Sequence, residues 1–461
     1  VSKVLQAYRF ALDPGVAQES ALRSHCGAQR FAFNWGLAQV TANLAQRNAE
    51  ASYGLEGDSQ TAPMSWSAYD LRERWNTVKA EVAPWWRENS KEAYASGLAN
   101  LATALTNWKD SQTSRRKGAG VRFPQFKGKR AVLSCRFTTG AFGLVDRDRR
   151  HVKLPRIGVV RTHESTRKLA RQVAQGNARI RSATITFRAG RWFCSFSVEI
   201  ARTDPLPARP DTVVGVDLGI KSLAVLSTGE RVSNPKHLEI AQRELRRLQR
   251  QAMRRCGPDK RTQQKPSQRW RQTQARIAKL HVRVANARRD GLHKLTIRLV
   301  RSFGTVVLED LSVSGMLRNH RLARRIAGIG MAEFRRQMTY KTAWSGVRLH
   351  IADRWYPSSK TCSGCGVVKA KLRLSERIYT CENCGLTLDR DLNAARNLAG
   401  LAELSSPSCG ATRNEPDGNP HQTRLVRAAG IATGRPTHGV GQRRHGNASA
   451  RDTPQRFLNG Q

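Results

Sequence analysis

Three acidic residues stand where a metal-dependent site would need them. Asp217 closes an apolar, β-branched run that begins at Thr212, and Glu309 closes a second run that begins at Gly304. Runs of this kind predict buried strands. Asp391 lies near the start of a predicted helix, where backbone N–H groups favour an anion. Three carboxylates from three segments suit two Mg²⁺ ions, which prefer oxygen ligands and together promote phosphodiester hydrolysis.

The predicted helix has a face that would let it approach a sheet closely. Ala394, Ala395 and Leu398 follow Asp391 at the three-, four- and seven-residue steps that share one helical face. Small residues there would bring Asp391 towards the ends of the strands. The alternative for Asp217, taken alone, is a strand-end aspartate that caps the following turn.

Four cysteines form two Cys-x2-Cys pairs. The pairs are Cys362 with Cys365 and Cys381 with Cys384, and fifteen residues separate them. This spacing is typical of a zinc ribbon, in which four thiolates hold one structural Zn²⁺. A glycine follows the second cysteine of each pair and suits a tight knuckle. A ribbon without metal and a redox role for the pairs are the alternatives, and the spacing favours them less.

The charge balance of the chain is strongly basic. The sequence has 80 Lys and Arg residues against 35 Asp and Glu residues, a formal net charge of +45. This excess indicates a polyanionic partner, bound through phosphate neutralisation and counterion release. A membrane surface is the competing polyanion, but we find no long apolar segment, signal-peptide pattern or lipidation motif. Nine cysteines without a dense disulfide framework favour the cytoplasm.

Two stretches are candidates for contact with nucleic acid. The first is a basic–aromatic stretch over residues 110–130, whose mixture of residues suits contact with a nucleic-acid backbone and stacking on bases. Its alternative is a solvated basic loop. The second is a basic helical region over residues 237–300 with a break near residue 257. The individual candidates are Arg122, Phe123, Phe126, Lys127, Arg246, Arg247, Arg250, Arg254 and Arg276.

The elements that must position these residues are both helical and extended. Alternating apolar residues over 182–200, with Ala189-Gly190 between them, predict a β-hairpin. A proline-rich boundary follows at 204–210. We further predict a strand over 3–13, helices over 16–48, 67–82 and 90–108, and no ordered structure over 401–461.

Several of these motifs resemble one known family. Residues 215–219 (Gly-Val-Asp-Leu-Gly), 307–311 (Val-Leu-Glu-Asp-Leu) and 389–397 (Asp-Arg-Asp-Leu-Asn-Ala-Ala-Arg-Asn) resemble the three RuvC motifs of the transposon-encoded TnpB nucleases. These OrfB-type proteins are relatives of the type V CRISPR effectors. The segment 355–362, which leads into the four-cysteine cluster, is similar to the same family. The resemblance covers most of residues 1–400.

The resemblance implies an α+β multidomain fold. An RNase H-like (RuvC) nuclease domain carries an inserted zinc ribbon, and a wedge-like β-barrel is interrupted by a helical recognition insert. The implied ranges are 209–354 and 386–400 for the nuclease domain, including the basic helices, 355–385 for the ribbon, 1–15 and 120–208 for the barrel, 16–119 for the insert, and 401–461 for a disordered tail.

The resemblance also implies a function. The family cleaves double-stranded DNA beside a short flanking motif, selected by a guide RNA derived from the transposon end. By motif matching, Asp217, Glu309 and Asp391 would hold two Mg²⁺, and Glu309 rather than Asp310 is the matching residue. Asp389 competes with Asp391 for the third position. A monomer bound to RNA, associated with the bacterial nucleoid when it binds DNA, is expected.

Three alternatives remain at this point. A miniature type V CRISPR effector would use the same scaffold with RNA from a different source. A DNA-binding regulator of transposition without nuclease activity would require the loss of an acid, and all three are present. A DNA-strand transposase lacks support. Nothing in the sequence singles out a tyrosine that would argue for this activity, and nothing supplies a recombination partner.

Overall fold

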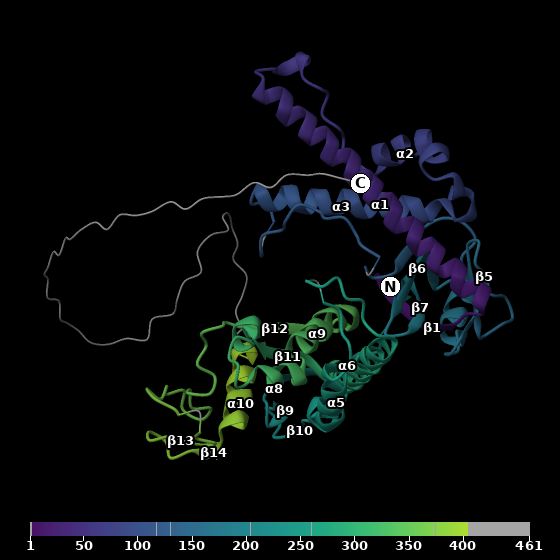
Figure 1. Ribbon diagram of the computed structural model, residues 1–461. Helices are drawn as coiled ribbons and strands as arrows, with labels where there is room; N and C mark the ends of the chain where they lie inside the picture. Colours follow the sequence, from purple (N-terminus) through teal and green to yellow (C-terminus); the bar gives the residue numbers. More distant parts are fainter. Residues whose placement is uncertain are drawn as a thin grey trace, which may run out of the picture. The chain divides into compact units, whose positions relative to one another are not determined.

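The computed structural model describes residues 2–116, 118–129, 131–202, 204–259, 261–373 and 375–403 (Figure 1). The predicted tail lies outside the described residues from position 404 onward. Its first three residues belong to the helix α10, which ends at Glu403. No helix among the described residues combines the length and the apolar character needed to span a membrane.

An antiparallel sheet of seven strands occupies the N-terminal part of the chain. Its order is β2-β6-β7-β1-β5-β4-β3. The predicted strand at the N-terminus and the predicted hairpin are both confirmed, as β1 and as the pair β6–β7. The strands are β1 (Ser2–Asp13), β2 (Ser134–Phe137), β3 (Gly143–Leu144), β4 (His151–Leu154), β5 (Gly158–Thr162), β6 (Ala178–Arg188) and β7 (Arg191–Arg202).

This sheet does not close into the predicted barrel. Its edges are β2 and β3, which have four and two residues and do not pair with each other among the described strands. Such short edge strands leave too few backbone groups to join the two ends of the sheet. The described part of the chain therefore contains an open sheet at this place.

Helices are inserted between β1 and β2. They are α1 (Val16–Ser52), α2 (Ala68–Val82) and α3 (Lys91–Gln112), with short 3₁₀ turns at Gly57–Ser59 and Pro84–Glu88. The hydroxyls of Ser67 and Ser90 cap α2 and α3 by accepting backbone N–H groups. Trp75 of α2 is buried. These helices share one continuous core with the seven-stranded sheet, which also carries the short helix α4 (Arg167–Ala174).

A second sheet of five strands holds the predicted acids. Its order is β10-β9-β8-β11-β12; β8, β11 and β12 run parallel, and β9 and β10 are antiparallel to their neighbours. The strand β8 begins inside the predicted boundary at 204–210. The strands are β8 (Arg209–Asp217), β9 (Ser222–Leu226), β10 (Arg231–Ser233), β11 (Phe303–Glu309) and β12 (Arg348–Ala352).

Helices cover both faces of the five-stranded sheet. Val214 and Val216 of β8 pack with α6 (Gln268–Ser302) and α9 (Met331–Ser345) on one face. Val213 and Val307 pack with α10 (Arg390–Glu403) on the other (Figure 1). The predicted break in the basic helical region is confirmed, because α5 (His237–Met253) ends well before α6 begins. Two short helices, α7 (Val313–Met316) and α8 (Ala323–Ile329), precede α9.

The four-cysteine segment forms a small unit between β12 and α10. Its strands β13 (Ile378–Thr380) and β14 (Thr387–Asp389) pair antiparallel around the second cysteine pair. Residues 387–389, predicted as part of the nuclease domain, thus belong to this hairpin. Tyr379 is buried at its centre beside Cys362 and Cys381.

Candidate active site and metal centre

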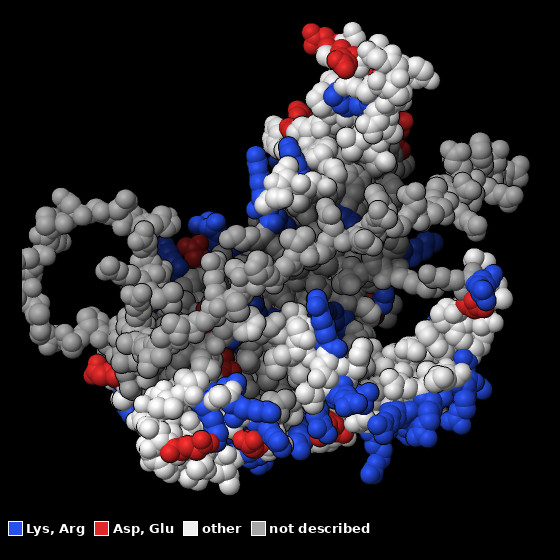
Figure 2. Space-filling view, turned by 90° about the vertical axis from the view of Figure 1, so that its left-hand side faces the viewer, with Lys and Arg blue, Asp and Glu red and all other residues white. Residues whose placement is uncertain are grey.

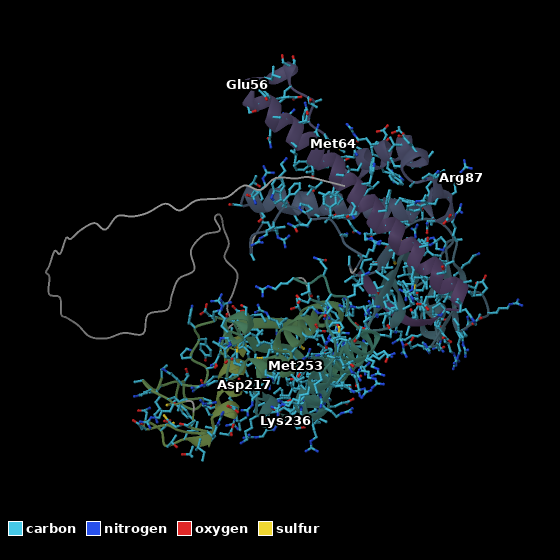
Figure 3. All side chains as sticks on the ribbon, viewed as in Figure 1. Glu56, Met64, Arg87, Asp217, Lys236 and Met253 are labelled. Carbon is cyan, nitrogen blue, oxygen red and sulfur yellow. The ribbon has the colours of Figure 1, made fainter. Side chains whose placement is uncertain are left out.

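Asp217 and Glu309 end two neighbouring parallel strands. Leu308 of β11 pairs with Val216 of β8, so each acid follows directly on that pair. Parallel strands bring their carboxyl ends to the same edge of a sheet, and side chains at matched positions point to the same face. Figure 3 labels Asp217 at this edge. The two carboxylates therefore lie side by side.

Close packing of α10 against β8 brings the third acid to this edge. A Cβ atom added to Gly215 would lie 2.0 Å from the carbonyl oxygen of Ala395 and 2.6 Å from the backbone nitrogen of Ala399. Only a glycine leaves room for the helix at this distance. Gly215 and Asp217 face the same side of the strand, and Asp391 lies one turn before Ala395. The small residues of α10 act as the sequence predicts.

The electrostatics of Asp217 reflect this convergence. Burial, followed by the negative charges of Glu309 and Asp391, raises the pKa of Asp217 to about 8. The Arg390 guanidinium lies 3.4 Å from the Asp391 carboxylate and partly opposes this shift. A group of half-buried carboxylates that repel one another is stabilised by a cation.

The donor set fits a hard divalent cation. All three side chains offer carboxylate oxygens, the ligands that Mg²⁺ prefers. Carboxylates supplied by three separate segments are the donors from which a two-ion hydrolytic site is built.

The two neighbouring aspartates have other partners. Asp389 accepts the backbone N–H groups of Asp391 at 3.0 Å and Leu392 at 3.2 Å, and pairs with Arg231 at 2.8 Å. It therefore caps α10. Although burial acts in the opposite direction, the Arg231 ion pair and these backbone donors lower the pKa of Asp389.

Asp310 is bound by two arginines. Its carboxylate pairs with Arg335 of α9 and, at 2.6 Å, with Arg354 after β12. Glu309 instead accepts a hydrogen bond from Ser358 and contributes to the field at Asp217. This arrangement favours Glu309 over Asp310 as the ligand from β11.

The four cysteines form a compact metal centre. Their Sγ atoms all lie within 4.8 Å of one another, which fits the tetrahedral site that the spacing predicts. Backbone N–H groups of Gly366 and Gly385 donate to the carbonyls of Cys362 and Cys381, at 2.9 and 3.0 Å. Both glycines adopt positive φ angles of 76° and 74°, which favour glycine. The two predicted knuckles are present.

We expect the purified protein to contain one zinc ion per chain. The variants Cys362→Ser and Cys384→Ser should lose it and melt at a lower temperature, because binding of a structural metal stabilises only the folded state. Elemental analysis and thermal unfolding measure both effects. Cys256→Ser, at an exposed cysteine outside the cluster, is the matched control and should keep its zinc. Wild-type protein without zinc would contradict the prediction.

In the basic–aromatic stretch, two of the predicted contact residues are exposed and two pack against other parts of the protein. Phe126 is 60% exposed, and Arg122 is exposed as well, so both are available to a ligand. Phe123 packs against the core, with its ring centroid 5.0 Å from that of Trp108. Lys127 is half-buried over the ring of Phe33. The latter two side chains already have protein partners.

The arginines predicted on the basic helices are all exposed. Arg246, Arg247, Arg250 and Arg254 lie on or just after α5, and Arg276 lies on α6. Leu248 and Ala252 form the buried face of α5. Figure 3 labels Lys236 and Met253, which mark the two ends of this helix. Lys and Arg side chains gather along the lower part of the face drawn in Figure 2.

Several residues around the acids escaped the sequence analysis. Gly215 stands inside a quoted motif, yet only the docked helix reveals its role. The sequence also did not indicate the contacts made by Arg231, Ser358 and the asparagines of α10. Their partners lie in distant segments, so no local spacing points to these contacts.

Three family models match the chain. They are described as "Probable transposase" over residues 195–320, "Cas12f1-like, TNB domain" over residues 332–398, and "Helix-turn-helix domain" over residues 2–49. The first two together cover the acids and the cysteine cluster. Within the third range the structure has β1 and a single long helix, α1, in place of a helix-turn-helix.

Relatives match over most of the chain. A Mycobacterium tuberculosis protein with the provisional name RNA-guided DNA endonuclease is 40% identical over 423 residues, which cover 87% of each chain. A protein of Streptomyces pristinaespiralis with the same provisional name is 32% identical and covers 89% of this chain and 92% of its own. The Escherichia coli protein InsQ, also provisionally an RNA-guided DNA endonuclease, is 31% identical and covers 87% of this chain and 94% of its own.

The fold also resembles a solved structure. The protein in a Cas12f1–sgRNA–target DNA complex superimposes with a TM-score of 0.51 at 12% identity, covering 86% of this chain and 99% of that one. At this identity the likeness shows a shared fold.

Proposed function

Because this chain belongs to the TnpB family of OrfB-type, transposon-encoded proteins, we propose that it is an RNA-guided DNA endonuclease that hydrolyses phosphodiester bonds. The observation that carries this proposal is the convergence of Asp217, Glu309 and Asp391 at one edge of the five-stranded sheet. Its relatives with provisional endonuclease names match along nearly their whole length, so the likeness extends beyond a single domain.

We assign the domains from the family membership of the chain and from the arrangement of its sheets and helices. The five-stranded sheet with α6, α9 and α10 is an RNase H-like (RuvC) nuclease domain, and the cysteine unit between β12 and α10 is its zinc ribbon. The seven-stranded sheet corresponds to the wedge domain and helices α1–α3 to the recognition insert. The three-layer order of helix, sheet and helix around β8 and β11 supports the nuclease assignment.

The acids would hold two Mg²⁺ ions, which when bound activate the attacking water and stabilise the leaving oxygen. The chain itself arranges the ligands. The parallel pairing of β8 and β11 fixes Asp217 beside Glu309, and the contact of α10 with Gly215 orients Asp391. Asp389 and Arg231 hold the first turn of α10 in place. Arg390 offsets part of the negative charge.

The partners follow from charge and from the site. A net charge of +45, with exposed arginines on α5 and α6, suits the phosphates of a guide RNA and of double-stranded target DNA. Sequence selection would rest on pairing between the guide and the target, and the protein would contact a short flanking motif. We propose a monomer with one RNA, acting in the bacterial cytoplasm on DNA of the nucleoid.

The decisive experiment is purification from cells that carry the native locus, followed by sequencing of the bound RNA. One discrete RNA species should survive a high-salt wash, because shape-specific contacts add to the salt-sensitive phosphate term. Its 3′ portion should match sequence beside the transposon end. Adding this RNA should convert the protein into a magnesium-dependent cutter of matching DNA.

Three other outcomes are informative. RNA that matches a CRISPR spacer would favour the type V effector. Discrete RNA and tight target binding without cleavage would favour a regulator of transposition. Heterogeneous RNA together with cleavage that proceeds equally well without it would contradict RNA guidance and leave an unguided nuclease.

A further inference from the structure

We propose that Ser358 is a positioning residue for the acid site: its hydroxyl orients the Glu309 carboxylate, and two asparagines of α10 hold the segment that carries it. This inference rests on the proposed function, because it assigns Glu309 to a metal-binding site. It adds a residue outside the acidic motifs and names the contacts through which the segment before the cysteine cluster reaches the acids.

The first contact joins Ser358 to the acid. The Ser358 hydroxyl donates a short hydrogen bond to Oε1 of Glu309. Ser358 is only 5% exposed, so protein atoms rather than water hold its side chain in place. A carboxylate with one oxygen fixed by a buried donor keeps its orientation and leaves lone pairs for a cation.

The second set of contacts holds the backbone around Ser358. The Asn397 side-chain amide donates to the carbonyl oxygens of Ser358 at 2.7 Å and Thr361 at 2.6 Å. Asn393, one turn earlier on α10, donates to the same Thr361 carbonyl at 2.6 Å and accepts the Ser363 N–H at 2.9 Å. Both asparagines are buried. They lie four residues apart, so they share one helical face.

These contacts connect three parts of the site. The helix that carries Asp391 also holds the segment 358–363, which contains Cys362 of the metal centre. The same segment holds Glu309 through Ser358. Outer partners of this kind set the orientation of metal ligands, and their loss commonly lowers metal affinity or activity about 10- to 100-fold. We place Ser358 in this class.

The test uses Ser358→Ala in the full-length chain, with Mn²⁺ as the probe for the acid site. Free Mn²⁺, measured by electron paramagnetic resonance in zinc-loaded protein, gives the dissociation constant without any need for cleavage. We expect Ser358→Ala to weaken Mn²⁺ binding about tenfold and to raise the half-saturating Mg²⁺ concentration for cleavage by a similar factor. Ser359→Ala, at the neighbouring serine, is the matched control and should change neither value.

A double-mutant cycle separates positioning from a general structural role. In a Glu309→Gln background, Ser358→Ala should cause little further loss of Mn²⁺ affinity, because its effect passes through the missing carboxylate. A loss that adds in full to that of Glu309→Gln would overturn the proposal. Loss of zinc or of cooperative melting in Ser358→Ala would also overturn it, because the serine would then maintain the ribbon rather than the acid site.

The two levels of the hypothesis fail in different ways. If Glu309→Gln leaves Mn²⁺ binding and cleavage unchanged, the acid site itself is misassigned. If Glu309→Gln impairs both and Ser358→Ala matches Ser359→Ala, the site stands and Ser358 has no positioning role.

Discussion

Asp217→Asn, Glu309→Gln and Asp391→Asn should each lower guided DNA cleavage by at least about a thousandfold, because each removes a ligand charge needed in the transition state. Binding of RNA and DNA should change little, since the exposed arginines that we propose as phosphate contacts are untouched. The measurement is single-turnover cleavage of matched DNA at saturating Mg²⁺, with an equilibrium binding assay on the same preparations.

The matched control for these variants is Asp211→Asn. Asp211 lies on the same strand as Asp217 but is exposed and distant from the acidic edge. It should cleave at the wild-type rate. Near-wild-type cleavage by any one of the three test variants would remove that residue from the site, and in the case of Asp391 it would point to Asp389.

Gly215→Ala should lower the free energy of unfolding by about 3 kcal/mol and abolish most of the cleavage activity. The added methyl group would overlap the backbone of α10 at Ala395 and Ala399, and a backbone cannot turn aside as a flexible side chain can. The helix would have to move off the sheet and carry Asp391 with it. Chemical denaturation measures the free energy of unfolding, and cleavage by the folded fraction measures the displacement of the acid.

Gly400→Ala serves as the control on the same helix. A Cβ atom at Gly400 would meet nothing within 4 Å, and alanine favours a helix over glycine. This variant should be as stable as the wild type or slightly more stable, and fully active. If Gly215→Ala behaves in the same way as Gly400→Ala, the close approach of α10 does not position the site.

The acidic edge was largely predictable because its signals are local. β-branched runs identified β8 and β11, and the small residues of α10 indicated a helix that lies close to a sheet. The cysteine spacing likewise predicted the metal centre, since its ligands come in two short local pairs. What the residues could not supply is the order of the strands, which depends on pairing between segments far apart in the chain.

The contacts around the acids were not predictable for the same reason. Ser358 contacts Glu309, and Arg231 contacts Asp389, only in the folded chain. No sequence spacing predicts either contact. The basic–aromatic stretch shows a different limit of sequence analysis. Composition made Phe123 and Phe126 equal candidates for base stacking. In the structure Phe123 packs against Trp108, and Phe126 is exposed.

The described residues do not contain the closed barrel that we predicted. Alternation correctly predicted β6 and β7, but closure depends on the edge strands. Those edges, β2 and β3, are too short to show a period in the sequence. The assignment of a wedge domain therefore rests on family membership and not on strand count.

The position of α10 has a consequence for biosynthesis. This helix is the last described element to be made, and it packs on β8, which emerges from the ribosome much earlier. A nascent chain that stops before α10 carries Asp217 and Glu309 but lacks the third acid. Domains fold as units during synthesis, and this one cannot be completed until α10 has been made. A truncated product of a prematurely terminated message would thus retain the exposed arginines of α5 and α6 without the complete set of acids.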